Sequence, residues 1–90
     1  MKLIDAVQQI DALDANATLY VRHPWEPSSD TEIAVEGTDD EEKLRSDGLS
    51  YFLEVLIAKD FLIGWQQTQR RAPTVKQSCN RLIEYATNDP

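Results

Sequence analysis

Apolar residues recur at helical spacing over the first part of the chain, with polar residues at the positions between them. Leu3, Val7 and Ile10 fall on one side of such a helix, and Asp5 falls on the other. An Asp-Ala-Asn sequence follows, and asparagine tolerates the left-handed backbone with which many helices end. The pattern therefore predicts an amphipathic helix over about 2–13.

Two short segments then alternate between apolar and polar residues with a period of two, which is typical of strands that bury one face. They span 18–22 and 31–36. Between them, residues 23–30 contain two prolines and a Ser-Ser-Asp sequence, and proline cannot donate a hydrogen bond to a sheet ladder. We expect a wide hairpin whose loop begins with His23. One face holds Leu19, Val21, Ile33 and Val35, and the opposite face holds Tyr20, Arg22, Glu32 and Glu36.

The segment 37–48 begins and ends with glycine and is rich in charge, which indicates an exposed connection. The residues after it fit two patterns, because their apolar positions match both the alternation of a strand and the stripe of a helix. Aromatic and β-branched residues are frequent over 51–57 and favour the strand. We expect a strand near 49–55 and a helix over about 58–69.

The last part of the chain has a clearer helix start. Thr74 and Gln77 have the spacing of a capping box, in which each side chain accepts a hydrogen bond from the backbone N–H of the other residue. Apolar residues then recur at helical spacing, and Asn88-Asp89-Pro90 ends the helix. The residues on its apolar face are Val75, Cys79, Leu82, Ile83 and Ala86.

Together these elements predict one α+β domain over residues 1–90, in the order helix, strand, strand, strand, helix, helix. The three strands form a small antiparallel sheet, which the three helices cover. Ninety residues are too few for two independent cores, and a chain of this length buries only somewhat over ~60% of its unfolded surface. A homodimer would bury more of the apolar surface by sharing it between two copies.

The cysteine content points to a reducing compartment, because Cys79 is the only cysteine and no internal disulfide can form. Acidic and amide residues interrupt the apolar positions near the first residue, which argues against a secretory signal. The longest apolar run, 55–58, is far below the ~18 residues that span a bilayer. We expect a cytoplasmic protein that does not enter a membrane.

Acidic residues are concentrated in the first half of the chain. Residues 1–48 hold twelve acidic side chains against four basic ones, whereas 49–90 hold four against five, and the formal net charge is −7. No lysine or arginine lies between Glu26 and Glu42. Such a field repels nucleic acid and attracts basic surfaces. The acidic residues of this stretch are Glu26, Asp30, Glu32, Glu36, Asp39, Asp40, Glu41 and Glu42.

This acidic stretch predicts a non-catalytic module that binds a basic protein partner, for example as an inhibitor of that partner. Trp25 lies in the adjoining loop, and tryptophan is a frequent anchor of protein interfaces. Two plainer interpretations stay open. In one, the acids only keep a solvated loop soluble; in the other, Trp25 folds back over the edge of the sheet.

An alternative function is the binding of small cationic ligands. Tyr51, Phe61 and Trp65 would line an apolar cleft, because aromatic faces attract organic cations. Core packing is a competing explanation for Phe61 and Trp65, since they share the apolar stripe of a helix. Gly64 lies within that stripe, where glycine destabilises a helix but permits the close approach of another element.

Catalytic and metal-binding patterns are missing from the sequence. The single histidine, His23, lacks an evident partner for acid–base work, and Cys79 lies on an apolar helix face, where thiols are unreactive. The consecutive acids at 39–42 do not match the alternate ligand positions of an EF-hand loop. We therefore expect no enzyme activity, no metal site and no cofactor.

Two segments, 48–55 (GLSYFLEV) and 82–89 (LIEYATND), resemble those of small uncharacterised bacterial proteins. The resembling proteins begin with an amphipathic helix, followed by a short strand and an acidic, variable middle. Small acidic proteins of this kind occur among the products of mobile gene cassettes and among immunity proteins that neutralise toxins. The resemblance implies a bacterial accessory protein and assigns no catalytic residue to this chain.

Overall fold

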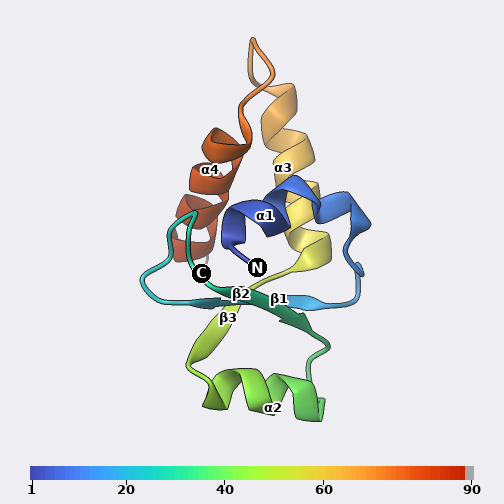
Figure 1. Ribbon diagram of the computed structural model, residues 1–90. Helices are drawn as coiled ribbons and strands as arrows, with labels where there is room; N and C mark the ends of the chain where they lie inside the picture. Colours follow the sequence, from blue (N-terminus) through green and yellow to red (C-terminus); the bar gives the residue numbers. More distant parts are fainter. Residues whose placement is uncertain (89–90) are drawn as a thin grey trace.

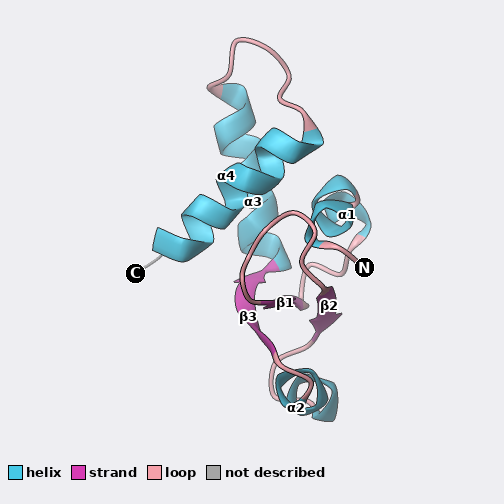
Figure 2. Cartoon of the chain, turned by 60° about the vertical axis from the view of Figure 1, so that its left-hand side comes forward, coloured by secondary structure: helices cyan, strands magenta, loops and turns pink. Residues whose placement is uncertain are grey.

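Helices lie on both faces of a three-stranded antiparallel sheet in the computed structural model, which describes residues 1–88 (Figure 1). The elements in chain order are α1 (Leu3–Gln8), the 3₁₀ turn η1 (Ile10–Ala12), β1 (Thr18–Arg22), β2 (Thr31–Ala34), α2 (Asp39–Ser46), β3 (Leu49–Glu54), α3 (Val55–Gln67) and α4 (Val75–Asn88). Helices α1, α3 and α4 lie over one face of the sheet, and α2 lies across the other (Figures 1 and 2).

The α+β class and the three-stranded antiparallel sheet are confirmed, but the predicted number and order of helices match only roughly. The described residues form four α-helices, because the segment 37–48 contains α2 and is not merely an exposed connection. The order is therefore helix, two strands, helix, strand, two helices. The helix expected over 2–13 is divided into α1 and the turn η1.

β1 is the central strand and pairs antiparallel with both neighbours, in the order β2-β1-β3. The predicted hairpin between β1 and β2 is confirmed. Leu19 lies opposite Ile33 on β2 and Leu53 on β3, and all three residues pack in the main core. This core lies between the sheet and α1, α3 and α4, and it holds fourteen of the buried residues in the described part of the chain.

A β-bulge interrupts the pairing of β3 with β1. Leu19 pairs with Leu53, but the next residue of β1 pairs with Tyr51, so that Phe52 is the extra residue. As a result Phe52 and Leu53, which are adjacent in sequence, are both buried in the main core. The strand is confirmed over Leu49–Glu54, but its simple apolar alternation breaks at the bulge.

β2 ends at Ala34, before the end of the expected segment 31–36. The prediction that Val35 faces inward is wrong, since 45% of its surface is exposed. The chain turns here towards α2, and the hydroxyl of Thr38 donates a hydrogen bond to the carbonyl of Val35 at 2.6 Å.

The last two helices begin differently. α3 follows β3 without a loop, so it starts at Val55 and not near Ala58 as predicted. α4 has the predicted capping box: the N–H of Thr74 donates to Oε1 of Gln77 at 2.9 Å, and the N–H of Gln77 donates to Oγ1 of Thr74 at 3.1 Å. The expected end of this helix at Asp89 and Pro90 lies outside the described residues.

Within residues 1–88, no helix is long and apolar enough to cross a membrane.

Candidate functional site

The acidic run 39–42 forms the first turn of α2, and local interactions explain why. Thr38 is the N-cap, and its hydroxyl accepts a hydrogen bond from the backbone N–H of Glu41 at 3.4 Å. The Glu41 carboxylate in turn accepts a hydrogen bond from the N–H of Gly37 at 2.6 Å. Acids in the first turn and two bases in the last turn match the helix dipole and favour the helix further.

α2 lies across the second face of the sheet (Figure 2), and only a small cluster is buried there. Tyr20, Ala34 and Leu49 form a small buried cluster on this face, and Leu44 is the residue of α2 that packs against it. No residue of α2 is itself fully buried. Both faces of β1 are therefore covered, although the alternation of this strand is typical of one buried face.

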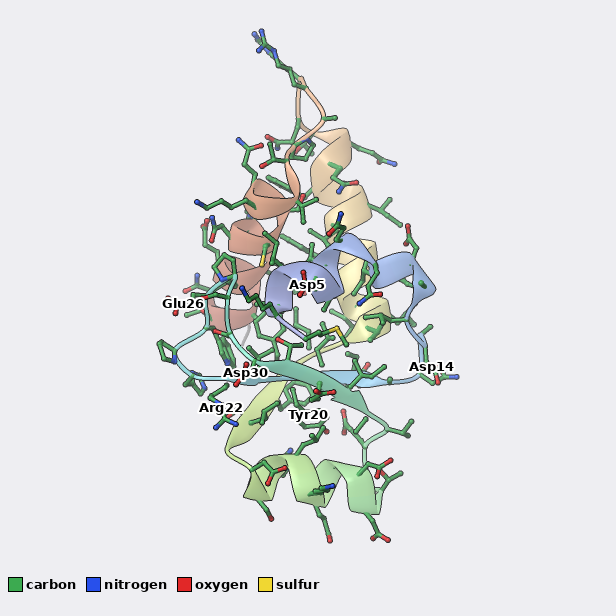
Figure 3. The ribbon with its side chains drawn as sticks, in the orientation of Figure 1. Asp5, Asp14, Tyr20, Arg22, Glu26 and Asp30 are labelled. Atoms are coloured by element: carbon green, nitrogen blue, oxygen red, sulfur yellow. The ribbon has the colours of Figure 1, made fainter. Side chains whose placement is uncertain are left out.

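Tyr20 lies between the sheet and α2 with its side chain wholly buried (Figure 3). Its ring meets that of Tyr51 edge-on, with centroids 6.3 Å apart, and the guanidinium of Arg45 lies 5.7 Å from its centre. Within residues 1–88, its hydroxyl makes no hydrogen bond of ordinary geometry. Burial raises the pKa of Tyr20, and the negative charges of Glu41 and Glu36 raise this pKa further.

Four of the eight predicted partner-binding acids are already bound within the described chain. They are Asp30 with Arg22 at 3.4 Å, Glu32 with the terminal ammonium group of Met1 at 3.7 Å, Glu36 with the hydroxyl of Thr18 at 3.2 Å, and Glu41 with Arg45 at 3.2 Å. The hydrogen bond from Gly37 holds the pKa of Glu41 below its ordinary value, and Arg45 lowers this pKa as well. Of these four acids, Glu41 contributes most directly to the fold, because it bonds the backbone at the start of α2. The pairs of Asp30 and Glu32 are largely exposed and contribute little.

The other four acids make no side-chain hydrogen bond or ion pair inside the described part of the chain. They are Glu26, Asp39, Asp40 and Glu42. All four are exposed, and the last three project from the first turn of α2.

A groove of about 350 Å³ lies between β2 and α2, and we call it the acidic groove. Three carboxylates and one lysine surround it, and Leu44 of α2 adds an apolar side chain. Ile33 borders the groove from β2, but its side chain packs against the main core on the other face of the sheet. The lining residues are Glu32, Ile33, Asp40, Lys43, Leu44 and Asp47. Among residues 1–88, no cluster of three or more histidine, cysteine, aspartate or glutamate side chains is arranged to hold a metal ion.

Trp25 folds back onto the sheet, as the plainer of its two interpretations predicts. Its indole N–H donates to the carbonyl of Val21 at 3.2 Å, and its ring meets Phe52 edge-on at 4.9 Å and stacks on His23 at 4.5 Å. The ring packs against the main core, and the loop that contains Glu26 rises on the same side of the sheet (Figure 3). The sheet therefore separates Trp25 and Glu26 from the acidic groove.

The structure does not bring the three aromatic residues of the alternative cleft together. Tyr51 lies on the α2 side of the sheet, whereas Phe61 and Trp65 pack against the main core. The ring of Phe61 is also covered by its neighbours, because it stacks on Tyr85 at 4.2 Å and the guanidinium of Arg81 lies 5.0 Å from its centre. The three residues therefore do not form a shared aromatic lining for a cationic ligand.

Cys79 is wholly buried in α4, which confirms its interpretation as a core residue. Burial raises the pKa of its thiol to about 11, so the thiol stays protonated at neutral pH and is a poor nucleophile.

Leu44 and Asp47 were not predicted at the acidic groove, because the charged segment 37–48 was interpreted as an exposed connection. The sequence did contain a signal for this helix. Thr38 precedes a run of acids, and two bases follow the acids, which is the charge order of a capped helix. An apolar residue at position 44 of such a helix indicates the side that contacts the sheet.

Comparisons of this chain with protein-family models, with curated proteins and with solved structures find no match. The resemblance to small bacterial proteins therefore stays a prediction.

Proposed function

We propose that this protein is a non-catalytic module that binds a basic protein partner through the acidic groove and the outer surface of α2. The observation that supports this proposal is the position of Asp39, Asp40 and Glu42, which are exposed on a helix that buries none of its residues. Carboxylates without a partner in the described chain are available to lysine and arginine side chains of a partner.

The arrangement of charge along the molecule supports the same proposal. The longest dimension is 42 Å, and α2 lies at the opposite end of the molecule from the loop between α3 and α4 (Figure 1). That loop contains Arg70 and Arg71. Charges more than about 8 Å apart are largely screened at physiological ionic strength, so these arginines do not neutralise the acids of α2. The α2 end is left with a negative field that attracts basic surfaces.

The chemistry of the acidic groove suits the side chain of a lysine or arginine. The methylene stem of such a side chain packs on apolar surface while its charged head stays among polar groups. Leu44 offers apolar surface, and Glu32, Asp40 and Asp47 offer carboxylates around it. In this proposal Leu44 takes the anchoring role that the sequence suggested for Trp25.

The proposal is tested by capturing partners from a lysate of the source organism with three baits. The first is the natural chain, and the second is the double variant Asp40→Asn with Glu42→Gln, which neutralises two unpartnered acids of α2. The third is a matched control, Asp11→Asn with Glu84→Gln, which removes the same charge from η1 and α4. Melting temperatures of the three baits check that each is folded.

We expect the natural chain and the control to retain a basic protein that the α2 variant releases. Binding should weaken as salt is raised, mainly through a slower association rate, because screening weakens electrostatic steering. Identical captured proteins from all three baits, or capture that salt does not affect, would contradict the proposal.

A further inference from the structure

The two ends of the molecule carry opposite charge. No acidic residue lies between Asp60 and Glu84, a segment that holds part of α3, the loop after it and much of α4. The same segment holds four bases, which are Arg70, Arg71, Lys76 and Arg81. Residues 26–42 show the reverse pattern, with eight acids and no base. Each chain therefore presents both members of a pair of surfaces with complementary charge.

The two arginines of the loop between α3 and α4 have no partner in their own chain. Arg70 and Arg71 are both exposed, and within residues 1–88 neither makes a hydrogen bond, an ion pair or a ring contact. By contrast, Arg22, Arg45 and Arg81 each pair with a carboxylate of the same chain. The loop arginines are therefore available to carboxylates of another molecule.

The shapes of the two ends are complementary as well. The loop with Arg70 and Arg71 projects beyond the ends of α3 and α4 (Figures 1 and 2). The acidic groove is a hollow between β2 and α2, and α2 lies at the opposite end of the molecule (Figure 1). A projecting loop fits a groove, whereas two loops or two grooves do not fit each other. The loop of one copy therefore matches the groove of a second copy in both shape and charge.

The chemistry of the groove suits an arginine side chain of this loop. The planar guanidinium binds carboxylates through paired hydrogen bonds, and its methylene stem packs on apolar surface. Asp40 lines the groove without a partner in the described chain, and Leu44 adds apolar surface beside it. Asp39 and Glu42 lie on the same turn of α2 as Asp40, within the reach of a second arginine.

We propose that this protein assembles head to tail, with Arg70 and Arg71 of one copy bound at the acidic groove of the next. This inference rests on the proposed function, because it uses the same groove, and it names the loop of a second copy as a ligand. The contact joins two different surfaces, so it extends into chains and does not close into a two-fold dimer.

The strength of this contact is limited by its charges. Each copy has a net charge of −7, but at physiological ionic strength charges more than about 8 Å from the contact are largely screened. Exposed charge pairs contribute little each. We therefore expect the assembly to form at high protein concentration and to dissociate on dilution.

Two variants, each with one of the two surfaces neutralised, test the assembly. Arg70→Gln with Arg71→Gln is the loop variant, and Asp40→Asn with Glu42→Gln is the α2 variant. In sedimentation equilibrium, the mass of the natural chain should rise with concentration beyond twice 10.3 kDa. For each variant alone, the dissociation constant should rise by at least about tenfold. An equimolar mixture should level off at the mass of a dimer, because only the intact loop of one variant and the intact groove of the other can meet.

Matched controls remove the same charges at other places. Lys2→Gln with Lys59→Gln is the control for the loop, and Asp11→Asn with Glu84→Gln is the control for α2. Both should assemble like the natural chain. The mixture separates a loss of contact from a loss of folding, since two misfolded variants do not restore each other's binding.

Four outcomes would overturn the head-to-tail assembly. They are a natural chain that stays monomeric at every concentration, a variant that associates alone like the natural chain, a mixture that stays monomeric or grows past a dimer, and a control that loses assembly.

Capture from a lysate distinguishes a failure of this inference from a failure of the proposed function. The loop variant keeps all the acids of α2, so as a bait it should still retain a basic partner. If the natural chain stays monomeric while the loop variant retains such a protein, only the head-to-tail assembly is wrong. If the α2 variant in addition captures the same proteins as the natural chain, the proposed function is wrong as well.

Discussion

The two faces of the sheet are built from the same three strands but are buried to very different depths. On the face below α1, α3 and α4, fourteen buried residues form the main core, whereas the face below α2 holds a buried cluster of three with one half-buried leucine of the helix against it. The difference comes from the covering helices. α4 contributes Cys79 and Leu82 to the core, and α2 contributes only Leu44 to its cluster.

This difference indicates a division of roles between the faces. Buried apolar area provides most of the free energy of folding, so the main core stabilises the domain. α2 depends instead on its N-cap, on the charges at its two ends and on one leucine. Asp39, Asp40 and Glu42 are not needed for packing, so this helix can present them as the exposed acids that we propose as a binding surface.

The largest expected effect on stability comes from shortening a side chain in the main core. Leu82→Ala removes a wholly buried side chain and should lower the free energy of unfolding by about 2–5 kcal/mol, since a cavity is added to the loss of apolar burial. Chemical denaturation measures the change. The exposed Val35→Ala should stay within about 0.5 kcal/mol of the natural chain. Equal losses in the two variants would show that burial does not explain the stability of this fold.

A smaller effect is expected on the other face. Leu44→Ala removes a half-buried side chain and should lower the free energy of unfolding by about 1 kcal/mol. The loss should be greatest near Leu44, so amide exchange should become faster in α2 by a larger factor than in α4, whose exchange follows global unfolding. If exchange accelerates equally in both helices, the two faces unfold as one cooperative unit, and the proposed difference in stability between them is wrong.

The smallest expected effect is a pH dependence at the N-terminus of α2. The pKa of Glu41 is lower in the folded chain than its ordinary value of 4.5, so the carboxylate stabilises the fold above this pH. That contribution is lost as the pH falls below 4.5 and through the lowered pKa. Thermal melts of the natural chain and of Glu41→Gln should therefore converge in acid and separate towards neutral pH. Parallel curves would mean that Glu41 does not help to hold α2.

Several elements could be predicted from the sequence because their signals are local. The alternation of 18–22 matches β1, and the capping box of Thr74 and Gln77 forms as expected at the start of α4. The candidate site was predicted only in part. Most of its acids were identified, but Asp47 was not. The loop position of Trp25 did not decide its role, since its ring packs on Phe52 and its indole N–H bonds Val21, away from α2.

The sequence by itself determined the periodicity of the strands, the caps of the helices and the excess of acid in the first half of the chain. These properties depend on residues within a few positions of one another, where spacing alone specifies which side chains meet. The tertiary structure alone decided that Tyr20 is covered by α2, that a bulge at Phe52 puts two adjacent residues in the core, and that the loop with Arg70 and Arg71 lies at the opposite end of the molecule from α2. Each of these depends on contacts between segments distant in sequence, and the free energy of those contacts arises only once the sheet has brought the segments together.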